Sequence, residues 1–167
     1  VHCLLTGESE SYYASFAVDP LGDLTRALAE GQVEQGQPRD GLDHPRGEPS
    51  AHLPVTAFVN SNQTHDQVGN RAQGERLITL AGEDAARVAH ALLLLSPYIP
   101  MLFMGEEWGA STPWQFFTSH PEPELREATA KGRIEEFEKM GWDPAIVPDP
   151  QDPETFHRSK LDWAEAS

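Results

Sequence analysis

The sequence predicts an α/β fold of the (β/α)8 TIM-barrel type, because two short apolar runs flank an amphipathic helical pattern and each run is followed by polar or charged side chains. The runs are residues 55–60 and 99–104, and the helical pattern covers Glu83–Leu95. Parallel strands joined through a helix are the repeating unit of such a barrel, whose functional groups lie at the C-terminal ends of the strands. A doubly wound parallel sheet fits this pattern almost as well.

The segment before the first predicted strand is expected to hold one surface helix and one loop. Pro20–Glu30 has apolar residues at helical spacing, with Asp19 placed to cap its start and Gly31 placed to end it. The apolar stripe consists of Leu21, Leu24 and Leu28. Residues 31–54 are rich in Gly, Pro, Asp, Glu and Gln with almost no apolar side chains, and this composition predicts a flexible loop.

The strand, helix and strand of the predicted unit follow in order. Residues 55–59 are β-prone and lead into a polar stretch, as expected of a buried strand that ends in a functional loop. Glu83–Leu95 should turn one apolar face to the core and stop before Pro97. That face consists of Ala85, Val88, Ala89, Leu92 and Leu95, with Arg87 and His90 on the outer face. Residues 99–104 predict a second buried strand.

The chain beyond Trp108 is expected to be peripheral. It holds an aromatic loop, a charged helix over residues 125–140 that ends at Gly141, and a connector over residues 143–153 rich in Pro and Asp. The acidic residues Glu135, Glu136 and Glu138 are expected to lie on the solvated face of this helix.

Charge and composition narrow the classes of partner. The 167 residues include 27 acidic and 12 basic ones, a formal charge of -15 that disfavours binding to nucleic acid and to anionic membranes. The longest apolar run, residues 91–95, is far too short to span a bilayer. A single cysteine, Cys3, leaves no internal disulfide and agrees with a cytoplasmic location.

Residues 64–72 bring an acid, an imidazole, amides and a guanidinium together directly after the first predicted strand. Asp66 can hold a developing positive charge, and Arg71 can orient a carboxylate. His65 and Gln67 can donate hydrogen bonds to hydroxyl groups. The alternative is structural, with His65 and Asp66 only satisfying the backbone of the loop.

Several longer stretches resemble the alpha-amylase family of glycoside hydrolases, and within it the trehalohydrolases. Residues 58–72, FVNSNQTHDQVGNRA, resemble the family's fourth signature region, and the GERL that follows resembles the trehalohydrolase form. Residues 96–109, SPYIPMLFMGEEWG, are similar to the segment on the eighth strand, and STPWQFFTSH at 111–120 to the loop after it. VPDPQDPETFHRSKLDW at 147–163 also resembles this group. Residues 31–54 depart from it, since trehalohydrolases tend to carry aromatic and basic side chains there.

The resemblance implies that residues 1–167 are a C-terminal fragment of the catalytic barrel, from the sixth helix through the eighth strand and the loops and helices after it. The start at Val1, without an initiator Met, agrees with a fragment. The nucleophile and general acid would then lie upstream of Val1, and the fragment alone would be inactive. Asp66 would be the third carboxylate, which stabilises the transition state, and His65 would bind the same sugar.

The activity implied is retaining hydrolysis of the α-1,4-glucosidic bond next to the terminal trehalose of a malto-oligosyltrehalose. This reaction releases trehalose and uses no cofactor or metal, so the expected partner is the oligosaccharide. Three alternatives stay open. They are a glycan branching enzyme, a metal-dependent phosphohydrolase with His65 and Asp66 as ligands, and, for the chain by itself, a non-catalytic carbohydrate-binding segment.

The remaining candidates for substrate binding are polar and aromatic residues of the same two strand ends. They are Gln67, Asn70, Arg71, Glu106, Glu107, Trp108, Trp114, Phe116 and Phe117. The two glutamates can approach the sugar or pair with a neighbouring arginine. Aromatic rings can stack on the apolar face of glucose. About half of the four aromatic candidates, Trp108, Trp114, Phe116 and Phe117, are expected to pack in the core instead.

Overall fold

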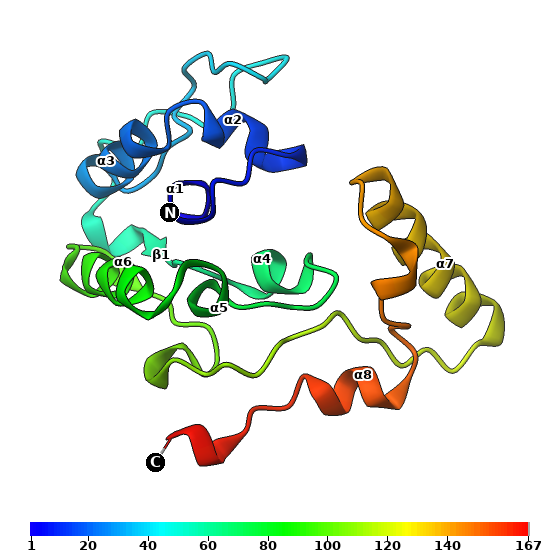
Figure 1. Cartoon of the computed structure of the whole chain (residues 1–167). Helices are drawn as coiled ribbons and strands as arrows, with labels where there is room; N and C mark the ends of the chain where they lie inside the picture. Colours follow the sequence, from blue (N-terminus) through cyan, green and yellow to red (C-terminus); the bar gives the residue numbers. More distant parts are fainter. Residues whose placement is uncertain (167) are drawn as a thin grey trace. The chain divides into compact units, whose positions relative to one another are not determined.

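The computed structural model describes residues 1–166 (Figure 1). The chain consists of two compact units. The first unit comprises Val1–Asn62 and Glu83–Leu102, and the second comprises Gln63–Gly82 and residues 103–166. The first unit contains α1 (His2–Thr6), α2 (Ala14–Ala17), α3 (Pro20–Glu30), β1 (Val59–Asn60), α6 (Glu83–Leu95) and β2 (Ile99–Pro100). The second contains α4 (His65–Gly69), α5 (Leu77–Ala81), α7 (Pro123–Lys139) and α8 (Pro153–Arg158).

Short 3-10 helices complete both units. They are η1 (Ser11–Tyr13) and η2 (Val55–Ala57) in the first unit, and η3 (Glu106–Trp108), η4 (Pro144–Ile146) and η5 (Trp163–Ala166) in the second. Among residues 1–166, no helix is both long and apolar enough to cross a membrane.

The predicted surface helix is confirmed at both ends as α3. The carboxylate of Asp19 accepts a hydrogen bond from the amide of Gly22 at 3.0 Å, which satisfies a free donor of the first turn. Gly31 ends the helix with φ 89°, a left-handed conformation that favours glycine, and its amide donates to the carbonyl of Ala27. No α3 residue is fully buried, as expected of a surface helix.

The two predicted strands are parallel neighbours, but both are shorter than predicted. In the register, Val59 pairs with Ile99 and Asn60 with Pro100. The expected run from residue 55 is wrong, because Val55–Ala57 form a 3-10 turn in which the amide of Ala57 donates to the carbonyl of Pro54. The second run likewise leaves the strand after Pro100.

The expected burial of these strands is also wrong for this chain, since Val59 is 56% exposed and Ile99 is 45% exposed. A strand can extend only where a neighbour pairs with its backbone, and within residues 1–166 the sheet consists of β1 and β2 alone. The parallel strand, helix and strand unit is therefore present without a closed barrel around it.

Helix α6 has the predicted bounds, but of the predicted core face only Ala89 is fully buried. Ala89 and Leu93 are buried, while Val88 is 62% exposed and Leu95 is 86% exposed. An apolar stripe becomes a buried face only where another element packs on it, and the side that is packed here is the narrow one around Ala89. Leu92 is likewise 40% exposed.

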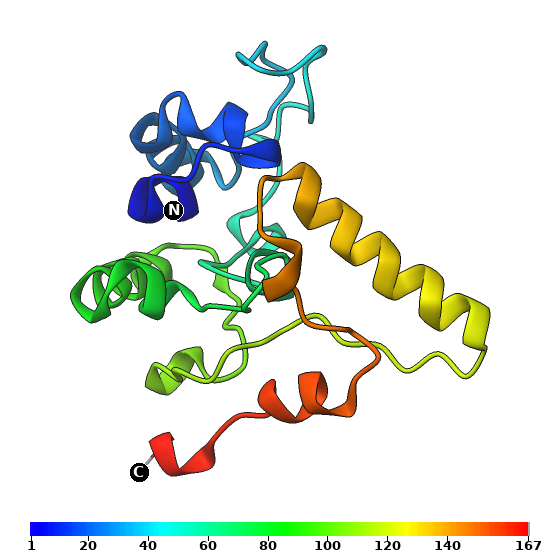
Figure 2. The same cartoon turned by 45° about the vertical axis from the view of Figure 1, so that its right-hand side comes forward.

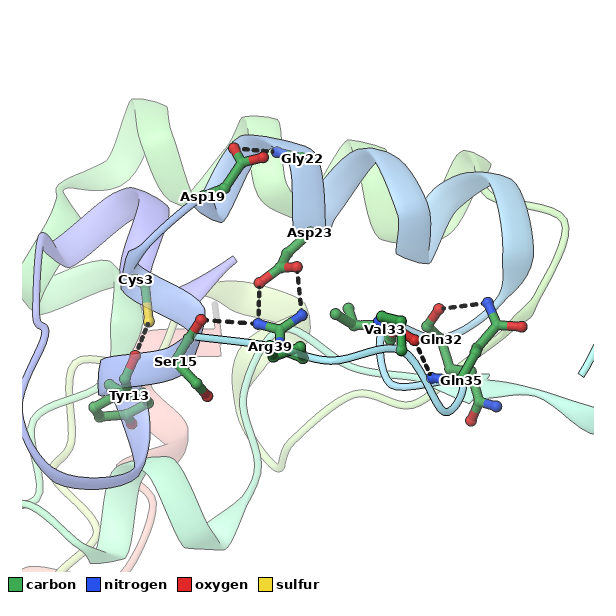
Figure 3. A network of polar contacts seen from close by, with 11 residues as sticks. Cys3, Tyr13, Ser15, Asp19, Gly22, Asp23, Gln32, Val33, Gln35 and Arg39 are labelled. Carbon is green, nitrogen blue, oxygen red and sulfur yellow. Dashed lines mark hydrogen bonds and ion pairs between the residues drawn. The ribbon is translucent and has the colours of Figure 1, made fainter. Parts of the chain in front are cut away.

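The segment 31–54 is irregular, as predicted, and several polar contacts anchor it (Figure 3). Arg39 donates two hydrogen bonds of 2.7 Å to the carboxylate of Asp23 on α3, and a third of 2.9 Å to the carbonyl of Ser15. Gln35 forms an isolated antiparallel bridge with Gly47. The flexibility of this loop stays a prediction.

In the second unit, the predicted charged helix is present as α7 (yellow in Figure 2), which begins two residues earlier than predicted and has Met140 rather than Gly141 as its C-cap. Its acidic residues Glu135, Glu136 and Glu138 are exposed, as expected, and Phe137 is its one fully buried side chain. The connector after it contains η4, and α8 begins at Pro153 with the carboxylate of Asp152 as its cap.

Candidate functional site

The candidate site is centred on α4, whose first turn is fixed by a reciprocal cap. The hydroxyl of Thr64 accepts a hydrogen bond from the amide of Asp66 at 3.2 Å. The side-chain oxygen of Gln67 accepts from the amide of Thr64 at 2.8 Å and from its hydroxyl at 2.7 Å. This capping box stabilises a helix start and so sets the backbone from which His65 and Asp66 project.

His65 and Asp66 lie side by side on the surface of the second unit. Nε2 of His65 is 3.2 Å from Oδ1 of Asp66, and each side chain is 68% exposed. Exposure at a capped helix start leaves the imidazole and the carboxylate accessible to a ligand in this chain. The binding role of His65 and Asp66 stays a prediction, as does the structural alternative.

Trp114 is the residue that joins this helix to the loop after η3. Its ring meets the ring of His65 edge to face, with centroids 6.2 Å apart. The backbone amide of Trp114 donates to the carbonyl of Gly74 at 2.9 Å, and its indole lies against Gly69. Trp114 is half-buried and also contacts Phe103, with centroids 5.7 Å apart. This residue therefore packs at the site as well as bordering it.

The structure separates the four aromatic candidates into different surroundings. Phe117 joins Trp114 at 5.9 Å between ring centroids, and it packs on Phe156 at 5.1 Å. Trp108 instead pairs with Trp163 at 5.1 Å, and its indole nitrogen Nε1 is buried without a hydrogen-bond partner in the described part of the chain. Of these rings, Trp114 contacts His65 and Phe117 contacts Trp114, whereas Trp108 lies in another cluster.

The other candidates have mixed surroundings. Phe116 is 38% exposed and lies under the guanidinium of Arg133 at 4.8 Å. Glu106 accepts a hydrogen bond from the amide of Phe103 at 2.9 Å and so stabilises the turn that it begins, while Glu107 is exposed. The direct bond of Glu106 to the backbone gives it a structural role, which the sequence did not predict.

Three polar candidates of the α4 loop are used, at least in part, within the protein. Gln67 serves the helix cap through its side-chain oxygen. Arg71 forms an ion pair with Glu75, with Nε and Oε2 at 3.3 Å. Asn70 is exposed at the C-terminal end of α4, and its Oδ1 accepts a hydrogen bond from Arg133 at 3.5 Å. These contacts support the loop, so only part of each side chain remains for a ligand.

Arg76 was not among the predicted site residues, although it is the largest fully buried side chain. Its guanidinium donates to the carbonyl of Met104 at 2.7 Å and to the carbonyl of Thr112, and lies 5.1 Å from the ring centroid of Phe103. Burial lowers the pKa of this guanidinium, and the nearby carboxylates of Glu106, Glu165 and Glu107 partly oppose that shift. The only feature of the sequence that could have indicated its burial is its position directly before the apolar start of α5.

Arg133 on α7 was also not predicted. Its side chain is only 10% exposed, and it donates to the carbonyl of Gly69 at the end of α4. The helix that carries it lacks an apolar stripe, which is why its contact with the site could not be predicted from sequence.

Metal ligation was one of the open alternatives. Within residues 1–166, no three His, Cys, Asp or Glu side chains gather closely enough to hold a metal ion. The described residues therefore provide no set of metal ligands that would support the phosphohydrolase alternative.

Known proteins similar to this chain match it along its whole length. Malto-oligosyltrehalose trehalohydrolases from Brevibacterium helvolum and Arthrobacter ramosus are 57% and 55% identical over 100% and 99% of the chain, and one from Saccharolobus solfataricus is 37% identical over 98%. A crystal structure from Salmonella typhimurium, provisionally assigned to the alpha amylases, matches 98% of the chain at 52% identity with a TM-score of 0.90. No protein-family model matches. The chain spans about 28% of the length of these relatives.

Proposed function

We propose that this chain, which is homologous along its whole length to malto-oligosyltrehalose trehalohydrolases of the alpha-amylase family, forms part of a catalytic barrel. That barrel would belong to an enzyme of the same kind. The full-length protein would hydrolyse the α-1,4-glucosidic bond next to the terminal trehalose of a malto-oligosyltrehalose. The observation that carries this proposal is the exposed pair His65 and Asp66 on a capped helix, within a chain that matches these enzymes from end to end.

In retaining hydrolysis, one carboxylate attacks the anomeric carbon and another protonates the leaving oxygen, while positive charge develops on the sugar ring. We assign both of those carboxylates to other parts of the full-length enzyme. Asp66 would contact sugar hydroxyls more strongly as the ring flattens, so its binding energy is realised mainly in the transition state. His65 would donate a hydrogen bond to the same sugar.

The substrate-facing surface would extend from α4 to the loop after η3. Trp114 lies beside His65 and Phe117 beside Trp114, and the two rings would offer apolar surface for the CH face of a glucose ring. Gln67, Asn70, Arg71, Glu106 and Glu107 would contribute polar contacts with whichever of their atoms the protein leaves available. The exposed faces of β1, β2 and α6 would pack against the remaining strands and helices of the barrel. We propose a cytoplasmic location, with which the buried free thiol of Cys3 is compatible.

The test is an assay of the purified full-length enzyme with a malto-oligosyltrehalose and, separately, with the malto-oligosaccharide of the same number of glucose units. The expected result is release of free trehalose from the first substrate and much slower hydrolysis of the second. Formation of α-1,6 branches without trehalose would identify a branching enzyme instead. Binding of the oligosaccharide with no turnover would support the non-catalytic alternative.

A further inference from the structure

The segment that follows the aromatic loop, residues 111–120, is predicted from its sequence to be peripheral. It nevertheless contacts α4 and the residues after it, 64–74, which we call the site loop. We use the name helical clamp for α7, η4 and the residues between them, 123–146. In the clamp, Arg133 donates to the carbonyl of Gly69 and, at 3.5 Å, to Oδ1 of Asn70. These two acceptors lie at the C-terminal end of α4, the helix that begins with His65 and Asp66.

Two further contacts join the clamp to the residues that follow α4. The guanidinium of Arg71 lies 5.7 Å from the ring centroid of Trp142. The side-chain amide of Gln73 donates to the carbonyl of Ile146 at 2.6 Å. Residues 69–73 are thus held by the clamp through contacts of their main chain and of their side chains.

Arg133 is itself held in one orientation. Its guanidinium lies between the rings of Phe116 and Phe137, with centroid distances of 4.8 and 4.4 Å, and Nη1 is 3.3 Å from a carboxylate oxygen of Glu136. A guanidinium that contacts two aromatic rings, on a side chain that is nine-tenths buried, has little freedom to change its orientation.

Helix α4 needs such support because it has only five residues. A helix this short forms few internal hydrogen bonds and is not stable without tertiary contacts. Its start is fixed by the capping box of Thr64, and a cation at its C-terminal carbonyls is favoured by the helix dipole. The two ends of α4 therefore have separate supports, one from its own sequence and one from α7.

We propose that Arg133 is a positioning residue, which holds α4 through the carbonyl of Gly69 and thereby keeps His65 and Asp66 in the orientation that the sugar requires. This inference rests on the proposed function for its catalytic consequence, although the support of α4 can be tested apart from it. In this proposal Arg133 acts through its contact with the helix and not by touching the substrate.

The experiment compares R133M with K131M in the full-length enzyme. Met keeps much of the length of the arginine stem but has no donor, whereas Lys131 lies on the same helix with 74% of its side chain exposed. Hydrogen exchange measured on a peptide covering residues 65–70 should be about tenfold faster in R133M, the scale of one lost charge-assisted hydrogen bond, and unchanged in K131M. The kcat for trehalose release should fall about tenfold or more in R133M while KM changes little, since misplaced groups lose transition-state binding.

A second variant covers the case in which R133M does not fold. R133K keeps the positive charge with a single nitrogen, so it should show the same two effects to a smaller degree. Exchange of residues 65–70 equal to wild type in a folded Arg133 variant would overturn the proposal. If the wild-type enzyme releases no trehalose, the proposed function fails, and the exchange result still decides whether Arg133 holds α4.

Discussion

Gly69 lies so close to the indole of Trp114 that a Cβ atom on Gly69 would be 2.5 Å from ring carbon Cζ3. The glycine is at the end of α4, and its small size lets the aromatic loop approach the helix that carries His65. A second glycine, Gly74, meets the backbone of Trp114 equally closely. The site loop and the aromatic loop therefore pack closely because Gly69 and Gly74 leave room for Trp114.

Replacing Gly69 with Ala should destabilise the protein by about 1–3 kcal/mol, because the added methyl group forces the rigid indole or the helix to move. The matched control is Gly132→Ala on α7, where a Cβ meets nothing within 4 Å. That change should stabilise by about 0.5–1 kcal/mol through helix propensity. Urea unfolding of the full-length protein measures both. If adding Trp114→Phe to Gly69→Ala restores no stability, the close contact is not the cause.

Arg76→Met should cost about 2–4 kcal/mol of unfolding free energy, because it removes the buried guanidinium that donates to the carbonyls of Met104 and Thr112. Arg87→Met is the control, since Arg87 pairs with Glu83 on the surface and has 73% of its side chain exposed. The control should change stability by less than about 0.5 kcal/mol. Equal losses in the two variants would contradict a supporting role for Arg76.

Asp66→Asn in the full-length enzyme should lower kcat by at least about a hundredfold, the scale of one transition-state electrostatic contact. The thermal unfolding midpoint should hardly change, because the side chain is 68% exposed. Glu135→Gln, an exposed carboxylate on α7, should leave both quantities unchanged. Near-normal turnover by Asp66→Asn would remove Asp66 from the mechanism.

Trp114→Ala and Phe117→Ala should weaken use of malto-oligosyltrehalose more than residual hydrolysis of plain malto-oligosaccharide. The 1,1-linked trehalose unit directs its second ring differently from maltose, and rigid aromatic surface beside His65 can select that direction. The measurement is the ratio of kcat/KM for the two substrates. Phe156→Ala, which removes packing behind Phe117, is the control. A ratio that stays constant while both rates fall would assign the loop to packing alone.

The contact between Glu165, in η5, and Ser111 should weaken in acid. Ser111 donates hydrogen bonds to the carboxylate of Glu165 from its hydroxyl and its amide, and these bonds lower the pKa of Glu165 below its usual 4.5. A lowered pKa in the folded state means that the contact is fully present above pH 4.5 and is lost as the pH falls through the lowered value. The fluorescence of the Trp108 and Trp163 pair should report this loss. Glu165→Gln should lack that step, and an identical acid titration in both proteins would refute the assignment.

The local sequence by itself determined the elements whose ends are set by their own residues. Asp19 and Gly31 bound α3 as predicted, and α6 has its predicted limits, because caps and stop signals act within a few residues. The pairing of β1 with β2 also follows from the strand, helix and strand pattern. The resemblance of residues 58–72 to a known signature region pointed to His65 and Asp66, and the whole-length match to trehalohydrolases confirms that resemblance.

Tertiary structure alone decided which faces are buried and which distant residues meet. The apolar stripe of α6 indicated a core face, but burial depends on a partner element, and within that stripe Ala89 is buried while Val88 and Leu95 are exposed. Arg76 and Arg133 look like ordinary surface cations in the sequence. In the fold, Arg76 donates to the carbonyls of Met104 and Thr112, 28 and 36 residues away, and Arg133 donates to the carbonyl of Gly69, 64 residues away. No local periodicity reports such convergence, since hydrogen bonds to main-chain carbonyls do not depend on the identity of the residue that supplies them.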